Sequence, residues 1–108
     1  MLKIYIEKNT KNEKYRLKMK GHCGYAEEGK DIVCAAASIL CLTMGQVISD
    51  NKDKLEEKPR IVNHNGHCIV EWKPKKEYEG ALNNSLYTIK QGLRLLEHTY
   101  PTYVKFIE

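Results

Sequence analysis

Apolar and polar residues alternate at the start of the chain. Segments 2–7 and 14–20, LKIYIE and KYRLKMK, each place an apolar side chain at every second position. This period of two predicts two half-buried strands. The polar residues 8–13 between them include Asn9 and Asn12, which favour a turn. The two strands should therefore pair as a hairpin.

A helical period replaces the alternation after a loop that holds three glycines between residues 21 and 29. From Ile32 to about Ser49, apolar residues recur every three or four positions, which predicts a helix. Asp31 stands where an N-cap carboxylate would accept N–H groups of the first turn. Because the helix is apolar on nearly every side up to Gln46, we expect it to be well buried.

An Asn-Gly pair predicts a second hairpin further along the chain. It lies within HNGH, residues 64–67, between the strand-like segments 60–63 and 68–73. Asn-Gly between two such segments is a strong hairpin signal. Val70 and Trp72 are predicted to face the core.

A second amphipathic helix is predicted from about residue 78 to 99, and Pro101 stops it. Residues 103–107 are the candidate for a short final strand. The order is therefore β-β-α-β-β-α with a possible short C-terminal strand. This order predicts an α+β fold, a small single-domain sandwich over residues 1–108 with helices packed on one face of the strands.

Composition narrows the class of protein. The net charge of +4 comes from 18 basic and 14 acidic residues that are interspersed along the chain, whereas nucleic-acid binders usually carry a denser basic face. We therefore expect no direct contact with nucleic acid. No apolar stretch approaches the roughly 18 consecutive residues of a membrane span, and the first residues lack a secretory signal. The chain is predicted to be cytoplasmic, with its four cysteines as free thiols.

His22 and Cys34 are the candidates for chemistry. Cys34 falls in the first turn of the predicted helix, where unpaired N–H groups and the helix dipole favour a thiolate. An imidazole nearby would form an ion pair with it and protonate a leaving amine. The N–H groups of the same turn would stabilise an oxyanion. The alternatives from residue type alone are a buried structural thiol for Cys34 and a surface side chain for His22.

A metal site is the weaker interpretation. HNGHC places His64, His67 and Cys68 close together in the sequence. These histidines bracket a tight turn, however, and no second cluster completes a tetrahedral site at a familiar spacing. We predict no metal site here.

The segment GHCGYAEEGKDIVCAAASIL, residues 21–40, resembles the signature of the ribosomal-processing cysteine protease Prp family. The matching pattern is Gly-His, a short loop with Gly and Tyr, and then Gly-x-Asp-Ile-Val-Cys-Ala-Ala-x-Ser. The chain length and the order of elements also fit the family's single domain. Two positions depart from the family: Cys23 stands where Ala is frequent, and Ala37 where Val is frequent.

The resemblance implies a dimeric bacterial cysteine endopeptidase without metal or cofactor. Its substrate would be the N-terminal extension of a ribosomal large-subunit protein, the twenty-seventh in the series, removed during ribosome assembly. The catalytic dyad falls on His22 and Cys34, while Asp31 and Ser38 match supporting positions. The loop expected to cover the substrate comprises Gly21, Cys23, Gly24, Tyr25, Ala26, Glu27, Glu28, Gly29 and Lys30.

Two other functions compete with a protease. A non-enzymatic ribosome-associated binding protein would use the mildly basic surface and would bind RNA in a salt-sensitive way. A metal-binding or redox-sensing module would hold zinc or form a reversible disulfide.

Overall fold

The computed structural model describes residues 1–27, 30–64 and 66–107. Within these residues, two helices and five strands follow one another in the order β1 (Leu2–Asn9), β2 (Lys14–Lys20), α1 (Ile32–Asp50), β3 (Arg60–His64), β4 (His67–Trp72), α2 (Glu79–Thr99) and β5 (Val104–Phe106). Short 3-10 turns, Lys52–Lys54 and Lys76–Tyr78, precede β3 and α2. The predicted α+β fold is confirmed, and so is the short final strand.

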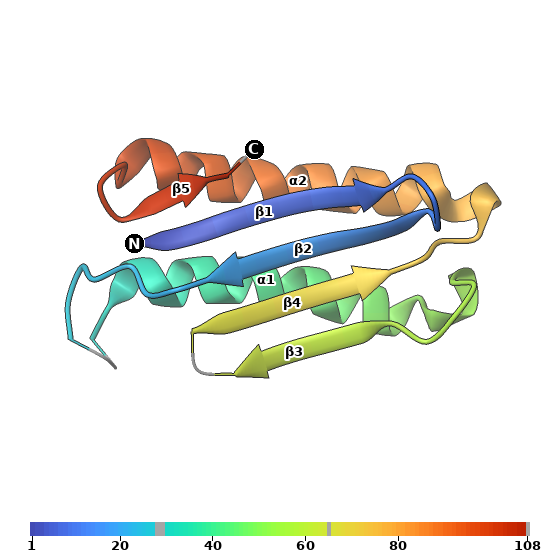
Figure 1. The fold of residues 1–108 in the computed structure, drawn as a ribbon, viewed down its shortest axis with the longest axis horizontal. Helices are drawn as coiled ribbons and strands as arrows, with labels where there is room; N and C mark the ends of the chain where they lie inside the picture. Colours follow the sequence, from blue (N-terminus) through green and yellow to red (C-terminus); the bar gives the residue numbers. More distant parts are fainter. Residues whose placement is uncertain (28–29, 65, 108) are drawn as a thin grey trace.

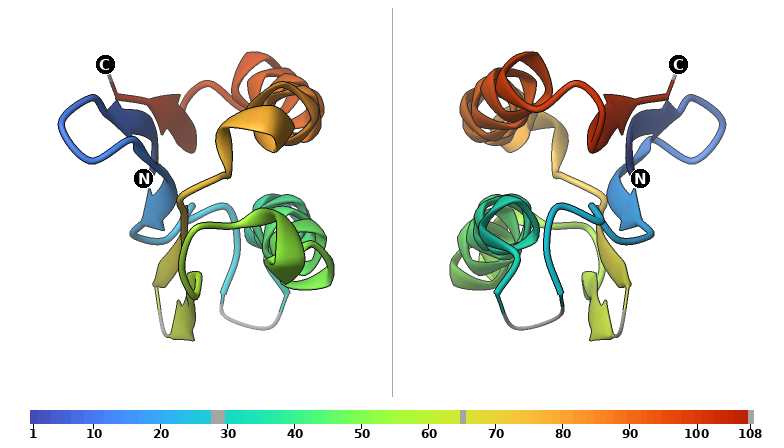
Figure 2. Two further views of the ribbon diagram at one scale, coloured as in Figure 1. Left: turned by 90° about the vertical axis from the view of Figure 1, so that its right-hand side faces the viewer. Right: turned by 90° about the vertical axis from the view of Figure 1, so that its left-hand side faces the viewer.

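The strands form one sheet in the order β3-β4-β2-β1-β5. Neighbouring strands run antiparallel except β1 and β5, which are parallel. Both helices lie on the same face of this sheet, so the molecule has two layers (Figures 1 and 2). The pairing of β2 with β4 joins the two predicted hairpins and places Lys20 opposite His67.

The core lies between the sheet and the helices, as the alternating pattern predicts. Val70 and Trp72 are buried, which confirms their predicted orientation. The strands supply further buried apolar side chains to the same layer, among them Ile4, Tyr15, Leu17 and Met19. From α2, the apolar stripe Leu82, Leu86, Ile89 and Leu93 is buried.

Helix α1 is less buried than its sequence predicts. Its buried residues are Val33, Ala37, Cys41, Met44, Gly45 and Ile48, which lie on one face. On the other face, Ile32 is 59% exposed and Ile39 is 64% exposed. The expectation of a well-buried helix was wrong, because in a two-layer fold the sheet covers only one side of each helix and the opposite side stays exposed. By length and composition α1 could cross a membrane, a test that core helices also pass; its packed face indicates a core helix.

Three segments meet at one end of the sheet. The first turn of α1, the end of β2 and the turn between β3 and β4 lie on the same side in Figure 1. The residues with candidate chemistry are on these segments.

Candidate active site

Asp31 determines where α1 begins. Its Oδ1 accepts a hydrogen bond from the Cys34 backbone N–H at 2.9 Å, which confirms the predicted N-cap. Its Oδ2 accepts backbone N–H groups from Tyr25 at 3.1 Å and Ala26 at 3.4 Å. One carboxylate therefore fixes both the helix start and the preceding loop.

The same contacts set the ionisation of Asp31. Burial alone would raise the pKa of this carboxyl, but the backbone N–H groups of Cys34, Ala26, Tyr25 and Val33 outweigh burial and lower the pKa below its ordinary value. Asp31 is therefore a carboxylate at neutral pH.

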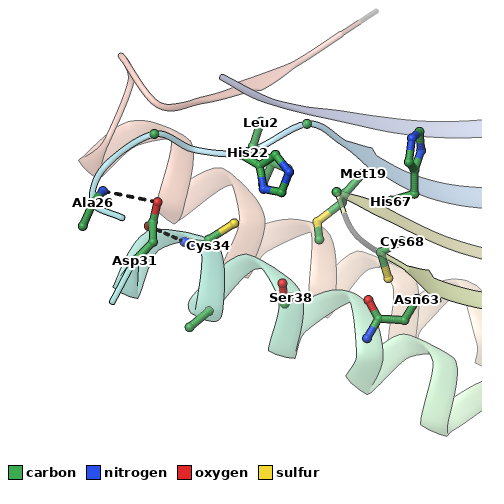
Figure 3. A pocket seen from close by; sticks show the side chains of 14 residues that line it. Leu2, Met19, His22, Ala26, Asp31, Cys34, Ser38, Asn63, His67 and Cys68 are labelled. Carbon is green, nitrogen blue, oxygen red and sulfur yellow. Dashed lines mark hydrogen bonds between the residues drawn. The ribbon is translucent and has the colours of Figure 1, made fainter. Parts of the chain in front are cut away.

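A pocket of about 500 Å³ opens beside this helix start, within the size range of ligand sites. His22, Asp31, Cys34 and Ser38 all line it. Figure 3 shows the Cys34 sulfur and the Ser38 hydroxyl pointing from α1 into the space below the His22 imidazole. The structure thus brings the two predicted dyad residues into one pocket, with Ser38 one helical turn after Cys34.

The His22 imidazole lies against the turn between β3 and β4. The Gly21 N–H donates to the Gly66 carbonyl at 2.8 Å, which ties the start of the loop to this turn. A Cβ atom built on Gly66 would lie 2.9 Å from His22 Nε2 and 3.4 Å from Cε1. Gly66 also has φ +79°, a conformation that favours glycine. The absence of a side chain at Gly66 therefore makes the room for the imidazole.

The second hairpin is the part of the site that the sequence did not predict. Asn63, Gly66, His67 and Cys68 line the pocket, together with Leu2, Met19 and Ala35. The HNGH signal predicted the turn but not its location. Only the pairing of β2 with β4 places it beside His22.

HNGHC does not converge on a metal. His64 and His67 are paired on neighbouring strands and are exposed. Cys68 is buried and contacts Cys41, whose pKa is raised by the hydrogen-bond contact with Cys68 and by burial. Because adjacent residues of a strand point to opposite faces, Cys68 and His67 point apart.

The predicted substrate loop is anchored through Tyr25. Its ring makes edge contacts with Tyr100 at 5.5 Å and Tyr103 at 5.3 Å between centroids. Glu27 pairs with Lys30 at 2.9 Å.

Gly21, Gly24 and Ala26 line the pocket, whereas Glu28 and Gly29 lie outside the described residues. The loop thus contributes one wall of the pocket and rests on the corner between α2 and β5.

Cys23 is buried beside Cys34. It is 2% exposed, and its sulfur, the Cys34 sulfur and an Asp31 oxygen all lie within 4.8 Å of one another. Burial, together with the charge of Cys34 and a hydrogen-bond contact with it, raises the pKa of Cys23 to about 12. These are donor types of a metal site, but the Asp31 oxygens already accept backbone N–H groups. The group is accounted for as a helix cap next to a pair of thiols.

The expected oxyanion donors are already engaged. The Cys34 N–H is bound to the Asp31 side chain, and the Ala35 N–H donates to the Asp31 carbonyl at 3.0 Å. The expectation that this turn offers unpaired N–H groups at these two residues is therefore wrong. The N-cap that was predicted to position Cys34 also uses these donors.

A family model described as cysteine protease Prp matches residues 1–105. A Staphylococcus aureus structure, described as an essential ribosomal processing protease Prp with a covalently linked product peptide, is 25% identical with a TM-score of 0.74. That alignment covers 98% of this chain and 97% of the other. A second structure so described, with a substrate peptide, is 24% identical with a TM-score of 0.71, covering 99% and 98%.

A Streptococcus mutans protein shares the fold at 18% identity, with a TM-score of 0.69 and coverage of 98% and 91%. No curated protein matches the sequence.

Proposed function

The chain belongs to the Prp family of cysteine proteases, and from this premise we propose that it removes the N-terminal extension of a ribosomal large-subunit protein, the twenty-seventh in the series. The observation that carries the proposal is the pocket in which His22 faces Cys34 at the start of α1. The similar Staphylococcus aureus structure, described as a ribosomal processing protease with a bound product peptide, supports the choice of substrate.

The reaction divides into two steps. In the first, the Cys34 sulfur attacks the scissile carbonyl carbon while His22 protonates the departing amine, so that the C–N bond breaks and a thioester forms. In the second, His22 removes a proton from water, which attacks the thioester and releases Cys34. Both steps need the sulfur and the imidazole close to the bound carbonyl, and the lining of one pocket by His22 and Cys34 supports this.

Asp31 and Ser38 support this reaction in different ways. Asp31 is a positioning residue, because it holds the helix turn that carries Cys34. Ser38 brings an O–H donor into the pocket on the same side of α1. Because the N–H groups of Cys34 and Ala35 are engaged, we assign Ser38 as a donor to the substrate carbonyl or its oxyanion.

The direct test is cleavage of a precursor that carries the extension, followed by mass spectrometry of both products. The parent enzyme should cut once, whereas Cys34→Ala and His22→Ala should each reduce the rate at least about 10³-fold. Cys41→Ala, which removes a fully buried thiol elsewhere on α1, is the matched control and should keep the rate. Equal rates for the parent and Cys34→Ala would refute the proposal.

We also propose a homodimer that works in the cytoplasm. The uncovered face of α1, with Ile32 and Ile39 exposed, supports burial against a second copy. Light scattering should give twice the chain mass of 12.5 kDa, and Ile39→Asp should give the monomer. Cell fractionation tests the location. A monomeric parent protein would exclude the dimer without affecting the assignment of the dyad.

A further inference from the structure

Two of the four thiols form a pair that the proposed reaction does not use. The Cys23 and Cys34 sulfurs lie no more than 4.8 Å apart, and a disulfide needs about 2.05 Å. Closure therefore needs less than about 3 Å of movement. Cys23 lies outside the helices and strands, between β2 and the start of α1.

We propose that Cys23 is a resolving thiol that captures Cys34 as a reversible disulfide when a peroxide oxidises it. The effect on activity rests on the proposed role of Cys34 as the nucleophile. Formation of the bond rests only on the geometry of the pair.

The surroundings of the two thiols determine the order of events. Cys34 is partly exposed in the pocket, while Cys23 is 2% exposed and keeps its proton at neutral pH. Oxidation acts on an accessible thiolate, so it begins at Cys34. When Cys34 is an uncharged sulfenic acid, the charge contribution of Cys34 to the raised pKa of Cys23 is removed, while burial, the larger cause, remains.

The chemistry balances in two steps. The Cys34 thiolate attacks one oxygen of hydrogen peroxide, the O–O bond breaks, and a sulfenic acid and hydroxide form. The Cys23 sulfur then attacks the Cys34 sulfur, and the sulfenic oxygen leaves as water with the thiol proton. The two sulfurs lose two electrons in total and the peroxide gains two. A dithiol reductant reverses the bond.

The other thiol pair provides a contrast. Cys41 and Cys68 are 0% and 4% exposed and lie on α1 and β4. Both lie in regular elements of the core, so forming a disulfide between them would strain the packing. Oxidation at this pair should therefore be slower than at Cys23 and Cys34.

The experiment treats the purified protein with hydrogen peroxide in the presence of a chelator. Trypsin cleavage after Lys20 and Lys30 leaves Cys23 in the peptide 21–30, apart from Cys34. We expect that peptide to be linked to the peptide 31–52 with two hydrogens lost, and fragmentation should place the bond at Cys34 and not at Cys41. Activity should fall and return with dithiothreitol. Peroxide should also inactivate Cys23→Ala, but dithiothreitol should restore at least about fivefold less of this variant's starting activity than it restores in the parent. Without Cys23, the sulfenic acid at Cys34 is oxidised further to sulfinic acid, which dithiothreitol does not reduce.

Controls separate this proposal from the protease assignment. Cys41→Ala should recover as the parent does. Equal recovery in Cys23→Ala, or a linkage that joins Cys41 to Cys68 in place of this pair, would overturn the proposal. Linkage mapping on the parent needs no variant and no activity. It therefore shows whether the Cys23–Cys34 disulfide forms even if Cys34→Ala shows that the protease assignment is wrong.

A second, independent observation concerns the sheet face that the helices leave open (Figure 2). The strand register places Lys105, Lys3, Lys20 and His67 side by side on four neighbouring strands. All four are exposed. Lys18 follows in the next row, with its amine 5.3 Å from the centre of the Tyr5 ring.

This basic row costs stability on its own. Like charges directly opposite each other on neighbouring strands repel. Within the described residues, Glu71 on this face pairs with Arg16 at 3.2 Å and Arg60 at 3.3 Å, not with the basic row. The lysines of the row form no ion pair among the residues that the structure describes.

We infer that the basic row binds the phosphate backbone of RNA. A polyanion would relieve the repulsion within the row, and phosphate contacts of lysine need no base recognition. Because the Lys18 amine lies over the Tyr5 ring, this face offers positive charge to the phosphates and no free ring on which a base could stack. This inference departs from the expectation of no contact with nucleic acid, which rested on charges interspersed along the sequence. The lysines are far apart in the sequence, and only the strand register brings them together. The row lies at the end of β2 that leads to His22.

Fluorescence anisotropy with a labelled single-stranded RNA tests the row. The parent should bind with an affinity that falls as salt rises, and Lys3→Glu with Lys20→Glu should weaken binding at least about tenfold and flatten the salt slope. Lys52→Glu with Lys58→Glu makes the same charge change at exposed positions elsewhere and should keep most of the affinity. No binding by the parent, or equal losses in both double variants, would overturn the inference.

Discussion

Gly66 is expected to set the position of the His22 imidazole, the proposed acid and base of the reaction, and Gly66→Ala tests this. The new Cβ would stand 2.9 Å from His22 Nε2, whereas ordinary contact begins near 3.4 Å. The imidazole must therefore move by at least the difference, about 0.5 Å. It is the end of a side chain, so it moves more readily than the turn. A misplacement approaching 1 Å costs up to about 100-fold in rate.

We expect Gly66→Ala to lower kcat by about 10- to 100-fold, which is about 1.4 to 2.7 kcal/mol of transition-state stabilisation. The positive φ of Gly66 adds a cost of about 1 to 2 kcal/mol to the folded state. Gly24→Ala separates these effects, because Gly24 has φ +74° with nothing within 4 Å of its added Cβ. It should lose similar stability but less kcat.

The assay combines peptide cleavage at saturating substrate with urea unfolding of each variant. Gly66→Asn adds a further comparison, because Asn tolerates positive φ better than Ala but carries the same Cβ. It should recover stability without recovering kcat. If Gly66→Ala keeps kcat within about twofold of the parent, Gly66 does not set the position of His22. The same conclusion follows if Gly24→Ala loses as much kcat as Gly66→Ala.

Three further variants test the other supports of the site. Tyr25→Ala removes two edge contacts, each worth about 0.5 to 1.5 kcal/mol, so KM for the peptide should rise more than kcat falls; an unchanged KM would contradict this. Asp31→Ala should cost about 1 kcal/mol of unfolding free energy at pH 7. Because the folded pKa of Asp31 is lowered, that contribution is fully present above about pH 4 and is lost as pH falls through the folded pKa, so the difference in urea unfolding between parent and variant should shrink as the solution is made more acidic. Ser38→Ala should lower kcat by about 10- to 100-fold if it donates to the oxyanion, and a loss confined to KM would exclude that role.

Local signals in the sequence predicted the elements because each signal acts over a few residues. The alternation in β1 and β2 follows from one buried face. Asp31 was predicted as an N-cap because the bond from its side chain to the Cys34 N–H spans three residues. The Asn-Gly turn belongs to the same class of short-range signal.

Long-range pairing produced what the sequence did not predict. The predicted packing of helices on one face of the strands implied an uncovered side of α1, but the nearly all-round apolar pattern of this helix indicated burial, and the structure follows the packing. The contact between Cys23 and Cys34, and that between Cys41 and Cys68, depends on where a loop and a strand lie relative to one helix. These features needed the three-dimensional arrangement.

The strand register connects the core to the proposed active site. Met19 faces Cys68 in the β2 and β4 pair, and both are buried. The same register places Lys20 opposite His67, so that Gly21 reaches the Gly66 carbonyl. A slip of one residue would turn one member of the buried pair outward and move Gly66 by about 3.4 Å along the strand. The burial that stabilises the sheet therefore also holds the turn against His22.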